Sequence, residues 1–296
     1  YNKITLNFNL NHLSSNGKFR LDFSANYGID DNRIFMGSDF INKALRTPPN
    51  SPAIYNDDGS LNWEDWITDN PLAELNRPQD IETYNLFANL SMSYEIINGL
   101  RLKVNSGFSK LDSNELIRTF KDYFNPDIWY RVNLYSLKGN TSRQSWIVEP
   151  QLTYNKKIGG LYMDGLVGST FQKSNSHYFA IQGSGYINES LMKNIEAADQ
   201  VSVLNDDNLE YRYAAIFGRI GINWKKKYFF NITGRRDGSS RFGPRNRFSN
   251  FWALGGAWIF SEENIFKQHL PFISFGKFRG SYGTTGNDQI PDYGFM

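Results

Sequence analysis

The sequence predicts an all-β chain, specifically a segment of an antiparallel transmembrane β-barrel. Three observations predict it: apolar and polar residues alternate with a period of two, most alternating runs exceed about ten residues, and tight turns alternate with long polar connections. Strands of soluble proteins are typically about half as long. Alternating strands average to a polar composition, which agrees with the mean hydropathy of −0.53.

The clearest strand runs from Tyr84 to Ile96, where one face is almost wholly apolar and the other carries mainly Asn and Ser. Before it, residues 3–11 and 19–30 alternate in the same way around the turn Ser14–Gly17, which predicts a long hairpin. About ten strands are expected in all. The remaining predicted strands are 100–113, 142–157, 160–176, 209–224, 227–239, 247–260 and 274–286.

The connections between these strands alternate in length. Tight turns are predicted at Ser14–Gly17, Asn98–Gly99, Ile158–Gly160 and Lys225–Lys227. Long stretches rich in Asn, Asp, Pro, Gly and Ser lie between them, near 31–80, 114–141 and 177–208. Short periplasmic turns and long extracellular loops are typical of outer-membrane barrels.

The aromatic content, 16% of the chain, also fits a barrel. Tyr84 and Tyr94 share the apolar face and stand about 25 Å apart along the axis of a tilted strand, the height of the apolar band. We expect them to mark its two aromatic girdles. Trp224 and Tyr228, beside a tight turn, are expected at the short-turn girdle.

The bulk composition and the motif search exclude several function classes. A net charge of +2 does not indicate nucleic acid as a partner, and the absence of cysteine excludes disulfides and thiolate metal sites. The three histidines are scattered, and the sequence shows no nucleophile elbow or P-loop. We therefore expect no enzyme activity, cofactor or resident metal. Asp57-Asp58-Gly59 is expected to be a turn rather than a calcium loop.

Two motifs carry a family resemblance. Residues 228–263 read YFFNITGRRDGSSRFGPRNRFSNFWALGGAWIFSEE, and residues 278–287 read FRGSYGTTGN. Their order and spacing resemble the SusC/RagA family of TonB-linked outer-membrane proteins of Bacteroidetes. The residues of the first motif are Arg235, Arg236, Asp237, Gly238, Ser239, Ser240, Arg241, Phe242 and Gly243, and those of the second are Arg279, Ser281, Tyr282, Gly283, Gly286 and Asn287.

The resemblance implies a roughly 22-stranded barrel around a plug, so residues 1–296 are expected to be a partial barrel domain from the middle of such a protein. The plug domain, its TonB-contacting segment and the C-terminal strands are expected outside this chain. Because the sequence begins at Tyr1 without a leader, we expect a mature or truncated piece.

Two groups of residues are candidates for function. Alternation places Arg235 and Asp237 on the lumen side near the long-loop rim, where they either fix the strand end and touch the plug or line the substrate path. Trp63 and Trp66, in an acidic loop, either contact substrate or partner or anchor the loop onto itself.

The function implied by the resemblance is nutrient uptake across the bacterial outer membrane. The expected partners are outer-membrane lipid, a SusD-like lipoprotein, TonB acting through the plug segment, and a glycan or peptide substrate. Two alternatives stay open: a passive porin or scaffold barrel in an outer-membrane complex, and a soluble carbohydrate-binding β-protein.

Overall fold

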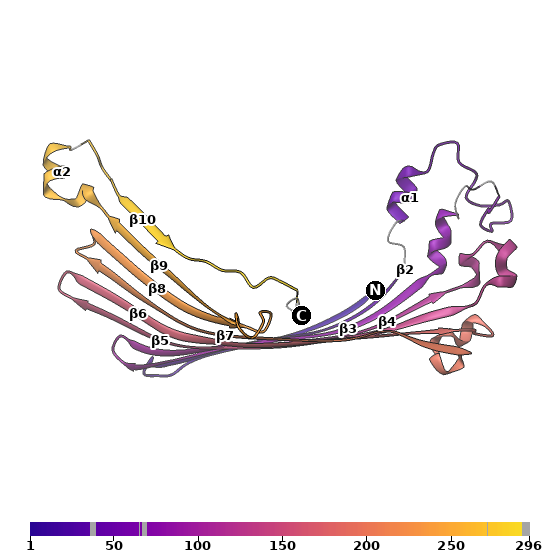
Figure 1. Cartoon of the computed structure of the whole chain (residues 1–296), viewed down its shortest axis with the longest axis horizontal. Coiled ribbons are helices and arrows are strands. Elements are labelled where there is room, and N and C mark those ends of the chain that lie inside the picture. The colour runs from indigo at the N-terminus through magenta and orange to yellow at the C-terminus, as the bar shows by residue number, and fades with distance from the viewer. Residues whose placement is uncertain (36–39, 65, 67–69, 271, 292–296) are drawn as a thin grey trace.

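The chain forms one curved antiparallel sheet of ten strands in sequence order (Figure 1). The computed structural model describes residues 1–35, 40–64, 66, 70–270 and 272–291. The fold class and the strand number agree with the sequence prediction. The strands are β1 (Asn2–Leu13), β2 (Phe19–Phe35), β3 (Pro78–Ile97), β4 (Leu100–Thr119), β5 (Tyr135–Ile158), β6 (Leu161–Ser184), β7 (Gln200–Trp224), β8 (Tyr228–Ser239), β9 (Phe248–Trp258) and β10 (Phe278–Gly283).

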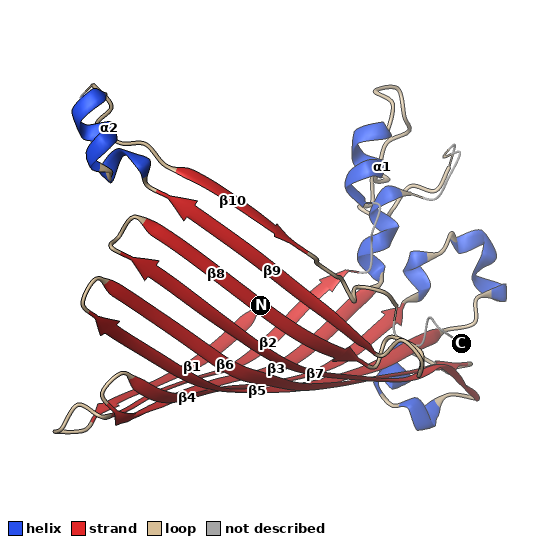
Figure 2. Ribbon diagram, turned by 60° about the vertical axis from the view of Figure 1, so that its left-hand side comes forward, coloured by secondary structure: helices blue, strands red, loops and turns tan. Residues whose placement is uncertain are grey.

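Short helices lie at the two ends of the strands (Figure 2). None of those in the described residues is long and apolar enough to cross a membrane. The α-helices are α1 (Phe40–Arg46) and α2 (Asn264–His269). The 3-10 turns are η1 (Pro71–Asn76), η2 (Lys121–Tyr123), η3 (Pro126–Arg131), η4 (Glu189–Lys193), η5 (Ile195–Ala197) and η6 (Phe260–Glu262).

The strand register confirms that apolar side chains gather on one face. Leu90 lies opposite Phe23 of β2 and Ser106 of β4, and Phe23 lies opposite Leu10 of β1. Residues on this face stay exposed although they are apolar, as in Ile216 at 61% and Ile220 at 53%. A broad band of exposed apolar side chains on a sheet face requires a non-aqueous neighbour. This is the outward, lipid-facing surface, so the alternative of a soluble β-protein is not supported.

The opposite, lumen-facing surface is polar and hydrogen-bonded across strands. Ser91 Oγ donates to Asn105 Oδ1 at 2.9 Å, and Thr170 Oγ1 donates to Glu149 Oε1 at 2.8 Å. Thr170 is buried by its neighbours. A hollow of about 460 Å³ over β1–β5 is lined mainly by Asn, Ser, Asp and Glu. Such a surface can face water or the polar side of a plug.

Strands β1 to β7 are longer than the sequence predicted, and the long loops predicted between them are shorter. Residues 114–119 and 135–141 continue β4 and β5, and 177–184 and 200–208 continue β6 and β7. Polar cross-strand hydrogen bonds hold these extensions, such as Asn140 Nδ2 to Asn114 Oδ1 at 2.8 Å. Their low hydropathy made them resemble loops. In contrast, β10 covers only Phe278–Gly283 of the predicted strand 274–286.

The sheet does not close on itself, because β1 and β10 form its two edges in the described part of the chain. An unpaired edge in hydrocarbon leaves backbone groups without hydrogen bonds at several kcal/mol each. Both edges therefore need further strands when the sheet lies in a membrane.

Candidate functional site

The first motif forms the end of β8 and the turn toward β9. Arg235 lies on the lumen face, where its Nε donates to Asp237 Oδ1 at 2.5 Å and its guanidinium lies 5.4 Å from the Phe217 ring centroid. The same guanidinium donates to the Tyr213 hydroxyl. Arg236 points outward, with its guanidinium 5.3 Å from the Phe248 ring centroid. The lumen assignment of Arg235 and Asp237 agrees with the register.

The two serines of this motif secure the strand end. Ser240 bonds β7 twice, with its N–H donating to Arg212 O at 2.9 Å and its Oγ accepting from Arg212 N at 2.9 Å. Ser239 is buried, and its Oγ accepts from Arg241 N at 3.3 Å. Gly238 allows Phe248 to approach, since a Cβ there would meet the ring at 2.6 Å. The turn closes with Asn246 N donating to Gly243 O at 2.9 Å.

Arg241 connects the first motif to the segment that follows the second. Its guanidinium covers the Tyr211 ring at 4.5 Å, and its Nη1 donates to Asp288 O at 3.2 Å. The Tyr211 hydroxyl donates to Asp288 Oδ2 at 2.7 Å. We call Tyr211, Arg241 and Asp288 the motif clip. Sequence reasoning missed Tyr211 and Asp288, because neither falls within the two motifs.

The second motif runs along β9 and then crosses the lumen face. Tyr282 points outward and its ring centroid lies 5.6 Å from that of Trp252. Gly286 passes directly over Phe251, whose ring a Cβ would meet at 2.3 Å. The other predicted residues of this motif are exposed, with Arg279 and Ser281 on the lumen-facing side of β10, Gly283 at its end and Asn287 beside the clip.

The two motifs together enclose a lumen-side hollow of about 370 Å³. Aromatic rings and polar groups line it, from β7, the turn after β8, β9 and the segment after β10. The residues that bound it include Tyr211, Tyr213, Asp237, Phe242, Phe251 and Asn287. The described residues contain no group of three His, Asp or Glu side chains that could hold a metal ion.

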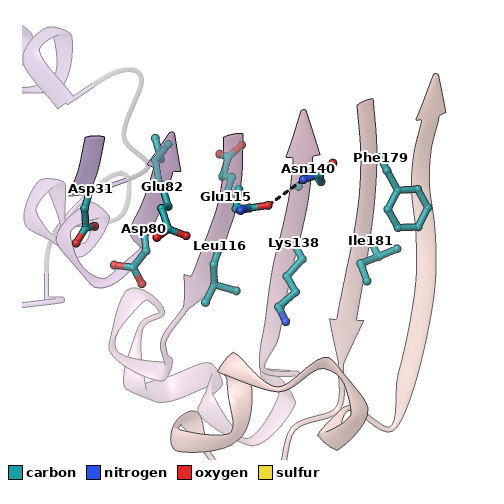
Figure 3. A pocket seen from close by; sticks show the side chains of 12 residues that line it. Asp31, Asp80, Glu82, Glu115, Leu116, Lys138, Asn140, Phe179 and Ile181 are labelled. Carbon is teal, nitrogen blue, oxygen red and sulfur yellow. Dashed lines mark hydrogen bonds between the residues drawn. The ribbon is translucent and has the colours of Figure 1, made fainter. Parts of the chain in front are cut away.

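A third hollow, also of about 460 Å³, lies on the outward face beyond Tyr84, toward the long loops (Figure 3). Its carboxylates and amides come from neighbouring strands, and the Arg118 guanidinium bonds Asp80 at 2.6 Å. The sheet is therefore polar on its outward side as well, once it extends past the apolar band. One paired row across five strands consists of Asp31, Glu82, Asn114, Asn140 and Phe179.

Comparison with known proteins places this geometry in a family, although no family model matches the sequence. The chain is 34% identical over 272 residues to TonB-dependent receptor P3 of Formosa agariphila, covering 87% of this chain and 26% of that protein. It is 26% identical to TonB-dependent receptor SusC of Bacteroides thetaiotaomicron over 97% of this chain and 29% of that protein. The structure of the RagAB peptide transporter matches with a TM-score of 0.79 at 19% identity, over 98% of this chain and 33% of that one.

The chain belongs to the SusC-like TonB-dependent receptors. It spans about a quarter to a third of the length of the relatives it matches. Receptors of this family reside in the outer membrane of the bacterial cell. The sequence resemblance is thereby confirmed, together with the barrel fold and the location.

The predicted girdle residues of the receptor segment all lie on its outward face. Tyr94 is 47% exposed and lies near the short turn, while Tyr84 lies ten residues earlier in β3, two residues after Glu82 of the polar row. Trp224 stacks on Tyr228 with ring centroids 5.3 Å apart. Their contact with lipid headgroups stays a prediction.

The first long loop of the receptor segment is internally bonded. Trp63 and Trp66 are both half-buried, and the buried Asn70 side chain donates to Ile54 O and Asn62 O at 2.8 Å. A substrate or partner contact of the two tryptophans stays a prediction.

Residues Asp57-Asp58-Gly59 form a turn, in which Gly59 has φ of +82°. The Ser60 hydroxyl and N–H donate to the Asp58 carboxylate and hold the pKa of that carboxyl below its usual value.

Proposed function

We propose that this segment is part of the wall of an energised importer of bulky nutrients, either glycans or oligopeptides. In this proposal the rest of the receptor supplies the plug, the TonB-contacting segment and the strands that close the barrel. A SusD-like lipoprotein covers the long loops and captures the substrate. Energy arrives through TonB, because the outer membrane has no ATP of its own.

The observation that carries the proposal is the pairing of a lipid-facing sheet with sequence relatives that are TonB-dependent receptors. The 34% identity to receptor P3 extends over 87% of the chain. The polar lumen face agrees with a plugged barrel, since a plug with polar sides needs hydrogen-bonding partners along the wall. The similar RagAB structure is described as a peptide transporter, which supports peptides as one substrate class. The similarity to SusC supports a SusD-like lipoprotein partner by family analogy.

Uptake by the intact receptor in its own host tests the proposal. Labelled oligosaccharides and oligopeptides should enter in a receptor-dependent manner, and deleting TonB or dissipating the proton gradient should abolish uptake. The lipoprotein encoded beside the receptor gene should co-purify with it. A neighbouring glycoside hydrolase would favour glycans and a peptidase would favour peptides.

A passive porin or scaffold barrel is the rival function. A porin would continue to admit small solutes without TonB, whereas a scaffold would admit none in either background. Either result, with the receptor present at normal abundance, would overturn the import proposal.

A further inference from the structure

Five lysines gather where two neighbouring short turns meet. Lys156 and Lys157 lie in the last three residues of β5 before the first turn, and Lys225, Lys226 and Lys227 form the second. The turns touch, because Lys225 N donates to Gly160 O at 2.7 Å. We call these five residues the lysine cluster.

The lysine cluster is nearly unneutralised. Lys156, Lys157, Lys225 and Lys226 are exposed, and within the described residues Lys227 alone of the five forms an ion pair, with Glu263 at 3.2 Å. Five lysines and one glutamate carry a net charge of +4. Such a concentration of like charge is self-repelling unless an anion lies against it.

Two lysines of the second turn have a backbone conformation that lysine rarely adopts. Lys225 has φ of 53° and Lys226 has φ of 57°, which are left-handed conformations at the two central residues of the β-turn closed by Lys227 N donating to Trp224 O at 3.0 Å. Asn-Gly is the favoured pair at such positions, and a long side chain there is disfavoured. A sequence that breaks a local rule at an exposed turn, where packing does not demand it, points to a role for the side chains.

The surroundings of the cluster indicate which anion it meets. The Lys225 ammonium lies 5.0 Å from the Trp224 ring centroid, and Trp224 stacks on Tyr228 at the end of the apolar face. Lys156 shares its face with the exposed Tyr154 and lies opposite Met163. The charges of Lys225 and Lys156 therefore lie beside the lipid-facing surface at the depth of the lipid headgroups, whereas the register places Lys157 on the opposite face.

We propose that the lysine cluster binds the phosphates of anionic phospholipids in the periplasmic leaflet of the outer membrane. Short turns face the periplasm in barrels of this class. Each lysine near an anionic lipid surface adds to the affinity, and the attraction is screened by salt. This inference rests on the barrel fold and its orientation, and it is independent of whether the receptor imports.

The intact detergent-solubilised receptor provides the test, with melting temperature measured against added cardiolipin or phosphatidylcholine. The variant Lys225→Asn/Lys226→Gly removes two charges while installing the favoured turn, so the lipid-free receptor should melt at the same temperature or higher. Its apparent cardiolipin affinity should fall by about tenfold or more. If the variant responds more weakly to cardiolipin but as wild type to phosphatidylcholine, the change lies in anionic lipid binding and not in folding.

A matched control removes two outward lysines from the other end of the band. Lys110→Gln/Lys173→Gln should leave the cardiolipin response unchanged, because both lysines lie on the long-loop side. An equal cardiolipin response in wild type and the turn variant would overturn the proposal. So would tighter binding of a soluble anionic cell-wall fragment than of cardiolipin by wild type.

Discussion

Leu90→Arg tests the assignment of the two sheet faces. Leu90 lies four residues from Tyr94 and six from Tyr84 on β3, or about 10 and 15 Å along the barrel axis at a tilt near 40°. It is therefore close to the middle of the apolar band, opposite Phe23 and Ser106. An arginine at mid-depth on a lipid-facing strand costs about 2–4 kcal/mol of unfolding free energy.

Ser91→Arg is the matched variant on the lumen face. It removes a hydrogen bond to Asn105, worth about 0.5–1.5 kcal/mol, and brings a guanidinium opposite Asp22, which offsets part of that loss. We expect a net cost below about 1 kcal/mol. Leu90→Ala, which shortens the side chain without adding charge, should cost about 1–2 kcal/mol and so separates the charge from the lost apolar area.

The assay is reversible urea unfolding of the whole receptor in lipid vesicles. We expect Leu90→Arg to be the most destabilising of the three variants. Equal costs for the arginines at positions 90 and 91 would refute the assignment of faces, and a reversed order would mean that the strand is turned by one residue.

Three further predictions concern the clip, the second motif and the short-turn rim. Tyr211→Phe removes the hydrogen bond to Asp288 and should cost about 1–3 kcal/mol, seen as faster amide exchange in residues 284–291; unchanged exchange there would contradict the clip. Gly286→Val pushes a side chain into Phe251 and should destabilise by about 1–3 kcal/mol, whereas no change in urea midpoint would mean that this segment lies elsewhere. The pKa of Glu263 is lowered by hydrogen bonds from a tyrosine hydroxyl and a lysine, so its stabilisation is present above the ordinary glutamate pKa and is lost as pH falls through the lowered one. In Glu263→Gln the unfolding free energy should fall less steeply at acid pH than in wild type. The same acid-side fall in both proteins would show that the bonds of Glu263 to Tyr228 and Lys227 do not cause it.

The wall of the barrel was predictable because alternation is a local property of each strand. From Tyr84 to Tyr94 every second residue is apolar, and the paired strands repeat the pattern in register. The extensions of β4 to β7 were not predictable from hydropathy. At about 3.3 Å per residue and a tilt near 40°, the 24 residues of β5 span about 60 Å, more than twice the apolar band. The part outside the band is polar on both faces and therefore resembles loop sequence.

The motif clip shows a different limit of sequence reasoning. Both motifs were visible as strings, and alternation placed Arg235 and Asp237 on one face of the strand, as the register does. The contact between Tyr211 and Asp288 joins residues 77 positions apart and depends on the path of the chain after β10 over the lumen face. Nothing in the local pattern determines that path, because it follows from the close passage of Gly286 over Phe251.

A cysteine scan along β3 tests the central claim most directly, that this sheet is a membrane wall with one lipid face and one lumen face. The segment contains no cysteine, so single substitutions from Tyr84 to Tyr94 can be made in a cysteine-free version of the whole receptor. In intact outer membranes, even-numbered positions should react with a membrane-soluble maleimide and resist a charged one. Odd-numbered positions should show the reverse wherever water reaches them. Reactivity with the charged reagent at every position, or no alternation with a period of two, would contradict the account.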